Sequence, residues 1–256
     1  MSSPVPGPVP GPVPGPVPGT PYCGAPPLPG AVAWNLDPWL AAALLLGLAL
    51  AWPAGDGRGG RRALLAGWVV LGVVLLSPLC NLSVALFSAR VGQHVVLLTV
   101  AAPLLALALP ARRVGPAGLA AAAGAFALAL WLWHLPAPYA LTFRSDPAYW
   151  GMQASLVATA AWLWHGLLRG AAARPEAVLL AGLATAAQMG GLGALLTFAP
   201  RPLFAPHAGT TFAWGLTPLE DQQLGGLLMW VPGGIAFALV ALPALARTLR
   251  ADPLRP

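Results

Sequence analysis

Apolar residues fall into seven long stretches, separated by short segments that carry the arginines and many of the prolines. Each stretch is near the ~20 residues that a helix needs to cross a bilayer. They cover residues 36–53, 63–80, 91–110, 116–134, 149–168, 176–199 and 223–245. The pattern predicts an all-α polytopic membrane protein whose seven transmembrane helices occupy residues 34–248.

The composition agrees with a membrane protein, because 58% of the residues are hydrophobic and only 8% are charged. All 13 basic residues are arginine. The absence of lysine excludes a retinal-type photoreceptor, which needs a lysine for its Schiff base. We interpret the net charge of +6 as a signal of topology rather than of nucleic-acid binding.

The arginines between the stretches predict the orientation. Ten follow the first, third, fifth and seventh stretches, and three lie on the opposite side. Loops rich in arginine stay in the cytoplasm, so the N-terminus is predicted outside and the C-terminus inside the bacterial inner membrane. The ten are Arg58, Arg61, Arg62, Arg112, Arg113, Arg169, Arg174, Arg247, Arg250 and Arg255, and the three are Arg90, Arg144 and Arg201.

The two ends of the chain are predicted to lie outside the helical domain. Residues 4–19 are four copies of Pro-Val-Pro-Gly, which can form neither a helix nor a core. We assign residues 1–33 to a disordered extracytoplasmic tail and residues 249–256 to a short cytoplasmic one. Because Cys23 lies in this tail, the sequence favours neither a disulfide with Cys80 nor a copper thiolate, although both cysteines fall on the outer side.

With this orientation, polar residues gather in the outer half of the bundle, where lipid cannot satisfy them. They are His94, His134, Gln153 and Gln222, together with Met229. Imidazole and thioether groups are ligands of copper, so His94, His134 and Met229 are candidate metal ligands. The alternative is that His134, like His165, is an ordinary interface anchor, and His207 is expected to be solvated in a proline-rich loop. Gln188 is expected to bond between helices.

The start of the last stretch reads Asp221-Gln222-Gln223-Leu224-Gly225-Gly226. At helical spacing, Gln222, Gly226, Met229 and Gly233 share one stripe, which predicts a seam that lets another helix come close. Asp221, Gln222 and Gln223 are expected to hold the mouth of this helix. The glycines expected to permit close approach are Gly225, Gly226, Gly233 and Gly234.

Residues 221–234 resemble the signature of the CtaG family of cytochrome c oxidase assembly factors, the seven-span membrane type. The similarity covers roughly residues 34–246. Its other parts are 34–38, 77–79, Gln93-His94 with 102–105, and 133–136 with Tyr139. The resemblance implies a seven-helix protein that helps copper reach a heme–copper oxidase outside the membrane. It implies an oxidase subunit as partner and no catalysed reaction.

The chain departs from the family pattern at two positions. The family usually carries His-Met-x-Gln-His where this chain has Arg90-Val91-Gly92-Gln93-His94, and it tends to have a histidine at the position of Gln153. Arginine cannot bind a metal and would repel a cation beside His94. His94, His134 and Met229 are therefore the ligands that the resemblance leaves, with Gln93, Gln153, Trp230 and Pro232 as further functional residues.

Two other functions fit the same sequence. A metal-free membrane chaperone would bind an oxidase subunit through the glycine-lined seam. A transporter of metal or small solutes is disfavoured, because the inner half has few polar residues and no inverted repeat is visible. An enzyme is disfavoured because no Gly-x-Ser-x-Gly, no His-Glu-x-x-His and no carboxylate pair occurs within a span.

Overall fold

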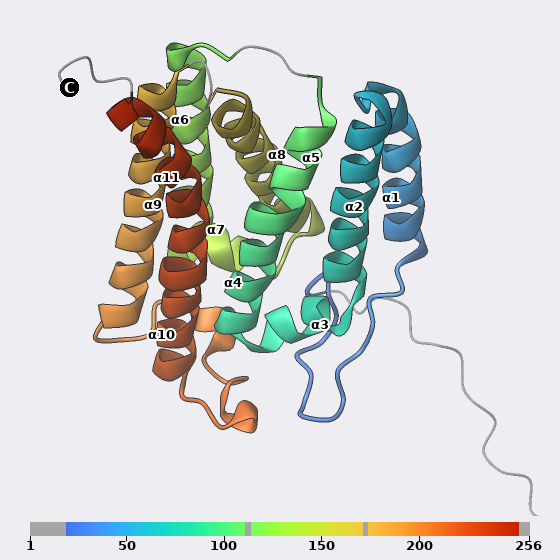
Figure 1. The fold of residues 1–256 in the computed structure, drawn as a ribbon. Helices are drawn as coiled ribbons and strands as arrows, with labels where there is room; N and C mark the ends of the chain where they lie inside the picture. The colour runs from blue at the N-terminus through green and yellow to red at the C-terminus, as the bar shows by residue number, and fades with distance from the viewer. Residues whose placement is uncertain (1–18, 111–113, 171–173, 251–256) are drawn as a thin grey trace, which may run out of the picture.

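The computed structural model describes residues 19–110, 114–170 and 174–250, and these residues form helices and loops without any strand (Figure 1). The predicted all-α class is thus confirmed. The long helices are α1 (Pro38–Ala51), α2 (Gly57–Leu76), α4 (Phe87–Val96) continued by η2 (Leu97–Ala101) and α5 (Ala102–Ala108), α6 (Pro116–Trp133), α8 (Asp146–Gly170), α9 (Pro175–Phe198), and α10 (Pro218–Leu228) continued by η5 (Met229–Gly233) and α11 (Gly234–Arg250).

Each predicted stretch overlaps one of these helices, with bounds that differ by up to six residues, and five of the helices are long and apolar enough to cross a membrane. They are 57–76, 87–108, 116–133, 175–198 and 218–250. Helix α1 with its 3-10 extension η1 (Trp52–Ala54) is apolar but shorter, and α8 carries polar residues along its length, including Gln153, Thr159 and His165. The membrane class is supported, while the count of seven spans and the sides of the termini stay predictions.

The described arginine-rich connections meet at one end of the bundle. Arg169 donates from Nη2 to the carbonyls of Leu107 and Leu109, at 3.2 and 3.1 Å, where α5 ends. Arg174 donates to the Val114 carbonyl at 3.3 Å. Cations at the C-terminus of a helix satisfy carbonyls that have no partner within the helix. Arg112, Arg113 and Arg255 lie outside the described residues.

Two of the long helices contain a π turn next to a proline. Pro103 follows η2, and Pro232 lies inside η5. A proline cannot donate a backbone hydrogen bond, and its ring collides with the carbonyl four residues earlier. A π turn accommodates that defect without ending the helix. Both helices therefore continue past a residue that would otherwise break them.

The predicted seam is the contact of α10 and η5 with α9. A Cβ added at Gly226 would lie 2.6 Å from the Gly193 carbonyl and would also collide with the Thr197 hydroxyl. A Cβ at Gly233 would lie 2.5 Å from the Met189 methyl carbon. Only glycine lets these backbones come so close. At Gly234 nothing lies within 4 Å of such a Cβ, so the prediction of close approach is wrong for that residue.

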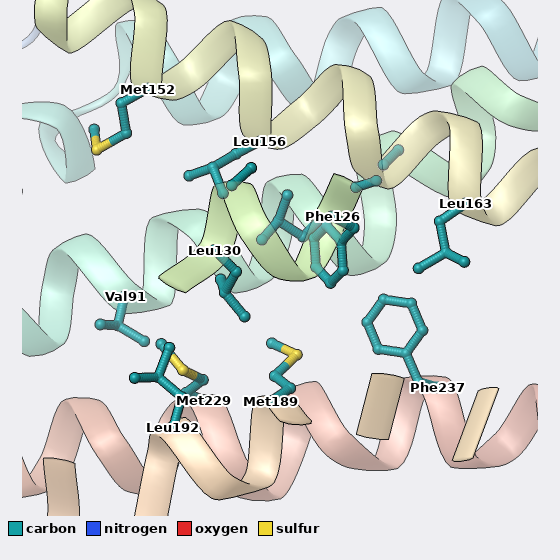
Figure 2. Packing of buried hydrophobic residues seen from close by; sticks show 14 of the residues in the cluster. Val91, Phe126, Leu130, Met152, Leu156, Leu163, Met189, Leu192, Met229 and Phe237 are labelled. Carbon is teal, nitrogen blue, oxygen red and sulfur yellow. The ribbon is translucent and has the colours of Figure 1, made fainter. Parts of the chain in front are cut away.

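Gly225 lies on another face of α10, which contacts α4. A Cβ there would lie 2.5 Å from the Phe87 ring at the start of α4. Helix α10 is therefore wedged between α4 and α9. Behind it, Met229 and Met189 belong to the apolar core, and Figure 2 shows Met229 beside Leu192 and Val91.

Residues 19–37, the N-terminal strap, are anchored to the bundle. Cys23 is bonded to Cys80 of α3 (Pro78–Ala85) by a disulfide. Asn81 Nδ2 donates to the Cys23 and Ala25 carbonyls at 2.9 Å each, and its Oδ1 accepts from the Ala33 amide at 3.1 Å. Residues 19–33, assigned above to a disordered tail, instead pack on α3 because the disulfide and Asn81 hold them. Residues 1–18, with most of the repeat, lie outside the described residues.

The seam predicts different effects on stability for substitutions at two glycines of the motif, Gly226 and Gly234. Gly226→Ala should lower the thermal unfolding midpoint of the detergent-purified protein, because overpacking a tight contact costs about 1–3 kcal/mol. Gly234→Ala has room for its methyl group and should be neutral or slightly stabilising, since alanine favours helix. Equal midpoints for Gly226→Ala and the wild type would show that the backbones do not approach as described.

Candidate functional site

Asp221 caps helix α4 from another helix. Leu86 is the N-cap residue of α4, and its side chain can accept no hydrogen bond. The Asp221 carboxylate takes that role, because it accepts the amides of Phe87 and Ser88 at 2.6 and 3.1 Å and also the Ser88 hydroxyl. Asp221 is itself fully buried. A negative charge at a helix N-terminus is favoured by the dipole, so this residue fixes where α4 begins.

Gln222 caps the C-terminal end of α9 with its side chain. Its Nε2 donates to the Leu196 carbonyl at 3.2 Å, one of the last four carbonyls of α9. Its Oε1 accepts the Leu203 amide at 2.6 Å in the following loop. Gln223 contributes a backbone carbonyl that accepts from the Thr197 hydroxyl at 3.5 Å. The polar start of the motif thus joins α4, α9 and α10.

With its start fixed, α4 presents Arg90, Gln93 and His94 from one face, since these positions are three and four residues apart. All three are buried. The His94 ring meets the His134 ring edge-on, with centroids 6.3 Å apart. The structure therefore brings together two of the predicted ligands from α4 and from the end of α6.

The protonation of these two imidazoles follows from their partners. His134 Nδ1 lies 2.7 Å from the Leu130 carbonyl, which accepts only from an N–H, so Nε2 of the neutral ring keeps a lone pair. Neither nitrogen of His94 has a hydrogen-bond partner. Buried polar atoms are usually paired, so two free nitrogens on one buried ring call for a ligand or water.

Gln93 and Gln153 extend the polar site toward the strap. Gln153 Nε2 lies 3.4 Å from Gln93 Oε1 and 3.2 Å from the Tyr149 hydroxyl. Gln93 in turn donates to the Val74 carbonyl of α2 at 3.4 Å. Gln153 Oε1 has no partner. These amides link α2, α4 and α8 around the histidine pair.

Arg90 occupies an aromatic cage that the sequence analysis did not predict. Its guanidinium carbon lies 4.3 Å from the ring centroid of Phe143, 5.1 Å from Tyr139 and 5.7 Å from Tyr149. Nη1 donates to the Thr142 hydroxyl at 3.0 Å, and Nε has no partner. Cation–π contacts of a desolvated charge are worth up to about 2 kcal/mol each. The rings hold the charge of Arg90 within the site.

His207 was expected to be solvated, and that expectation is wrong. The residue ends the short turn η3 (Ala205–His207), is buried, and has Nε2 2.6 Å from the Tyr139 hydroxyl of α7 (Pro136–Leu141). Burial, assisted by the nearby charge of Arg90, lowers the pKa of His207 to about 3. Burial likewise raises the pKa of Tyr139, against the opposing effect of Arg90. The pair is neutral at physiological pH.

Within the described part of the chain, no hydrogen bond or ring contact joins the other predicted residues to the two histidines. Met229 is in the apolar core (Figure 2), Trp230 covers Gly190 and Gly193, and Pro232 belongs to the π turn. His165, expected as an interface anchor, is buried with Nδ1 3.3 Å from the Ala106 carbonyl. Gln188 accepts from the Trp131 indole at 2.9 Å, so its predicted bond between helices is confirmed.

The donor set narrows the metals that the site can hold. Within the described ranges no group of three or more His, Cys, Asp or Glu side chains is placed for a metal ion. Zinc in proteins takes four ligands, which this site does not offer. Two imidazoles fit a soft ion of low coordination number such as Cu(I). The Arg90 charge weakens binding of any cation, although the aromatic cage directs it toward Tyr139 and Phe143.

Comparison with known proteins gives one match. A family model described as cytochrome c oxidase caa3 assembly factor (Caa3_CtaG) matches residues 42–251. No curated protein and no solved structure matches the chain. The matched region contains the motif of α10, the histidine pair and Arg90.

Removing the charge at Asp221 should destabilise the fold. Asp221→Asn keeps the shape but loses the carboxylate that accepts two amides and a hydroxyl, and hydrogen bonds to charged groups contribute about 1.5–3 kcal/mol. Thermal unfolding followed by circular dichroism should show a clearly lower midpoint. Glu220→Gln, at the exposed capping box of α10, is the control with a smaller effect. An Asp221→Asn protein as stable as the wild type contradicts the capping role.

His207 should make stability depend on pH. Its pKa is about 3 in the folded chain and near 6.5 in an unfolded one, so below pH 6.5 the unfolded chain binds more protons. The unfolding midpoint should therefore fall as the pH drops from 7 to 4, and less steeply in His207→Gln. Tyr139→Phe, which keeps the imidazole, should retain the slope. An unchanged slope in His207→Gln would contradict this assignment.

Proposed function

We propose that this chain, which belongs to the Caa3_CtaG family of cytochrome c oxidase caa3 assembly factors, passes Cu(I) to an oxidase subunit at the outer face of the membrane. His94 and His134 hold the ion in transit. Asp221 fixes the start of α4, which carries His94, and Gln222 fixes the end of the neighbouring α9. Copper is the cargo of this protein, and no bond in a substrate is made or broken.

The observation that carries this proposal is the pair of buried imidazoles, 6.3 Å apart between ring centroids, of which His94 has two unpartnered nitrogens. A low number of ligands suits a carrier, because a cargo held by two groups leaves for a site with more. Arg90 contributes in the same direction, since its charge disfavours a resident cation. The site thus favours transfer over storage.

A metal-free chaperone is the second candidate, and the seam favours it. The side chains of Asp221 and Gln222 are used for helix contacts, and Gly225, Gly226 and Gly233 serve close packing. In that case the motif would shape a surface for an oxidase subunit, and the histidines would be dispensable. The two candidates differ in which residues the cell needs.

The proposal predicts that His94→Ala and His134→Ala each lower cytochrome c oxidase activity in cells by tenfold or more, with the assembly factor present at normal abundance. The measurement is oxidase activity of isolated membranes, normalised to the factor by immunoblot. Leu132→Ala, an exposed position close to His134, is the control that should leave activity unchanged.

The chaperone candidate predicts a different ranking. Gly226→Leu would then reduce oxidase activity more than either histidine variant at equal abundance of the factor. Normal activity in both histidine variants would reject copper transfer through this site. If copper transfer is the function, copper added to the growth medium should restore oxidase activity in the histidine variants. It should not restore oxidase activity in Gly226→Leu.

A further inference from the structure

The disulfide between Cys23 and Cys80 lies close to the polar site. The Tyr149 hydroxyl is 3.4 Å from Cys23 Sγ and 3.7 Å from Cys80 Sγ. A disulfide sulfur has no hydrogen, so the tyrosine is the donor. The same hydroxyl accepts from Gln153, which bonds Gln93, the residue before His94. One hydrogen-bonded chain therefore runs from the two sulfurs to the histidine-bearing face of α4.

The sulfurs have more polar partners than a purely structural bridge requires. Asn35 Nδ2 lies 3.6 Å from Cys80 Sγ, in addition to Tyr149. Hydrogen-bond donors around sulfur stabilise the thiolate, which is the form that binds metals. The Cα atoms of Cys23 and Cys80 are 5.4 Å apart, so both side chains can reach a single ion.

The bridge is approachable from one side. Cys23 lines a cleft of about 550 Å³ between the strap and α3, together with Asn35 and Asn81. Cys80 is fully buried beneath it. Cys23 is 7% exposed, so it is the member of the bridge that lies nearer the cleft.

We propose that Cys23 and Cys80 form a redox-gated site for Cu(I), closed as the disulfide and opened by a protein dithiol at the outer face. The thiolate of the dithiol attacks Cys23 Sγ, and Cys80 leaves as a thiolate. The second thiol of the dithiol then resolves the mixed disulfide. The dithiol thus gives two electrons to the Cys23–Cys80 disulfide, which becomes two thiols, and leaves as a disulfide itself.

The two thiols then bind one Cu(I), releasing to water the protons that they carry. Thiolate is a softer ligand than imidazole and holds Cu(I) more tightly. The reduced pair therefore competes for Cu(I) with the histidine pair, which lies at the other end of the hydrogen-bonded chain. This inference rests on the proposed function only in taking copper as the cargo.

The test compares the oxidised and reduced forms of the purified full-length protein. Each form is freed of reductant anaerobically, loaded with Cu(I), and titrated with a chromogenic Cu(I) chelator. The reduced wild type should retain about one more copper per chain than the oxidised one. Cys23→Ser and Cys80→Ser should lose this increment, and His94→Ala/His134→Ala should keep it.

Equal copper in the oxidised and reduced wild type would overturn the inference. A reduced protein that aggregates on size exclusion or loses helix by circular dichroism would also overturn it, because the bridge would then be a structural staple. The double histidine variant separates the two proposals. If its oxidised form binds as much copper as the oxidised wild type, the histidine carrier fails, whereas the reduction-dependent increment is judged on the cysteine variants alone.

Discussion

A helix whose N-cap is leucine leaves its first amides without acceptors, and in the interior of this bundle water cannot supply them. Asp221 supplies them from α10, in a contact that joins residues more than 130 positions apart. The carboxylate is buried, so it depends on those donors as much as α4 depends on it. Because Gly225 and Gly226 lie on the two sides of α10, the same short segment sets the distances to both α4 and α9.

The chemistry of the site depends on the contact between Asp221 and the start of α4. Once α4 begins at Phe87, helical spacing decides that Arg90, Gln93 and His94 face inward together. The edge-on contact of His94 with His134 then places two buried imidazoles beside a permanent cation. Aromatic rings stabilise that cation without neutralising it, so the site keeps a positive field. Such a field weakens the hold on any cation in the site.

Helix positions could be predicted from the long apolar stretches and the class of protein from composition, and the two outer histidines from the assumed orientation. The contacts that the sequence did not reveal are long-range ones. Nothing local to His207 distinguishes a solvated loop from burial against Tyr139, which lies 68 positions away. The strap was misassigned because a single disulfide and Asn81 outweigh its proline-rich composition. Met229 shares a helical stripe with Gln222, yet only packing decides that its sulfur lies in the apolar core.

The most direct measurement is X-ray absorption at the copper edge of the oxidised, Cu(I)-loaded protein, in which the cysteines are bridged and cannot bind. The account predicts a two-coordinate ion with imidazole nitrogen scatterers and no sulfur shell, because His94 and His134 alone are proposed to hold the ion. The same signal should be lost in His94→Ala/His134→Ala, because that variant lacks both proposed ligands. A spectrum dominated by sulfur, or no bound copper at all, would contradict the claim that His94 and His134 carry the ion.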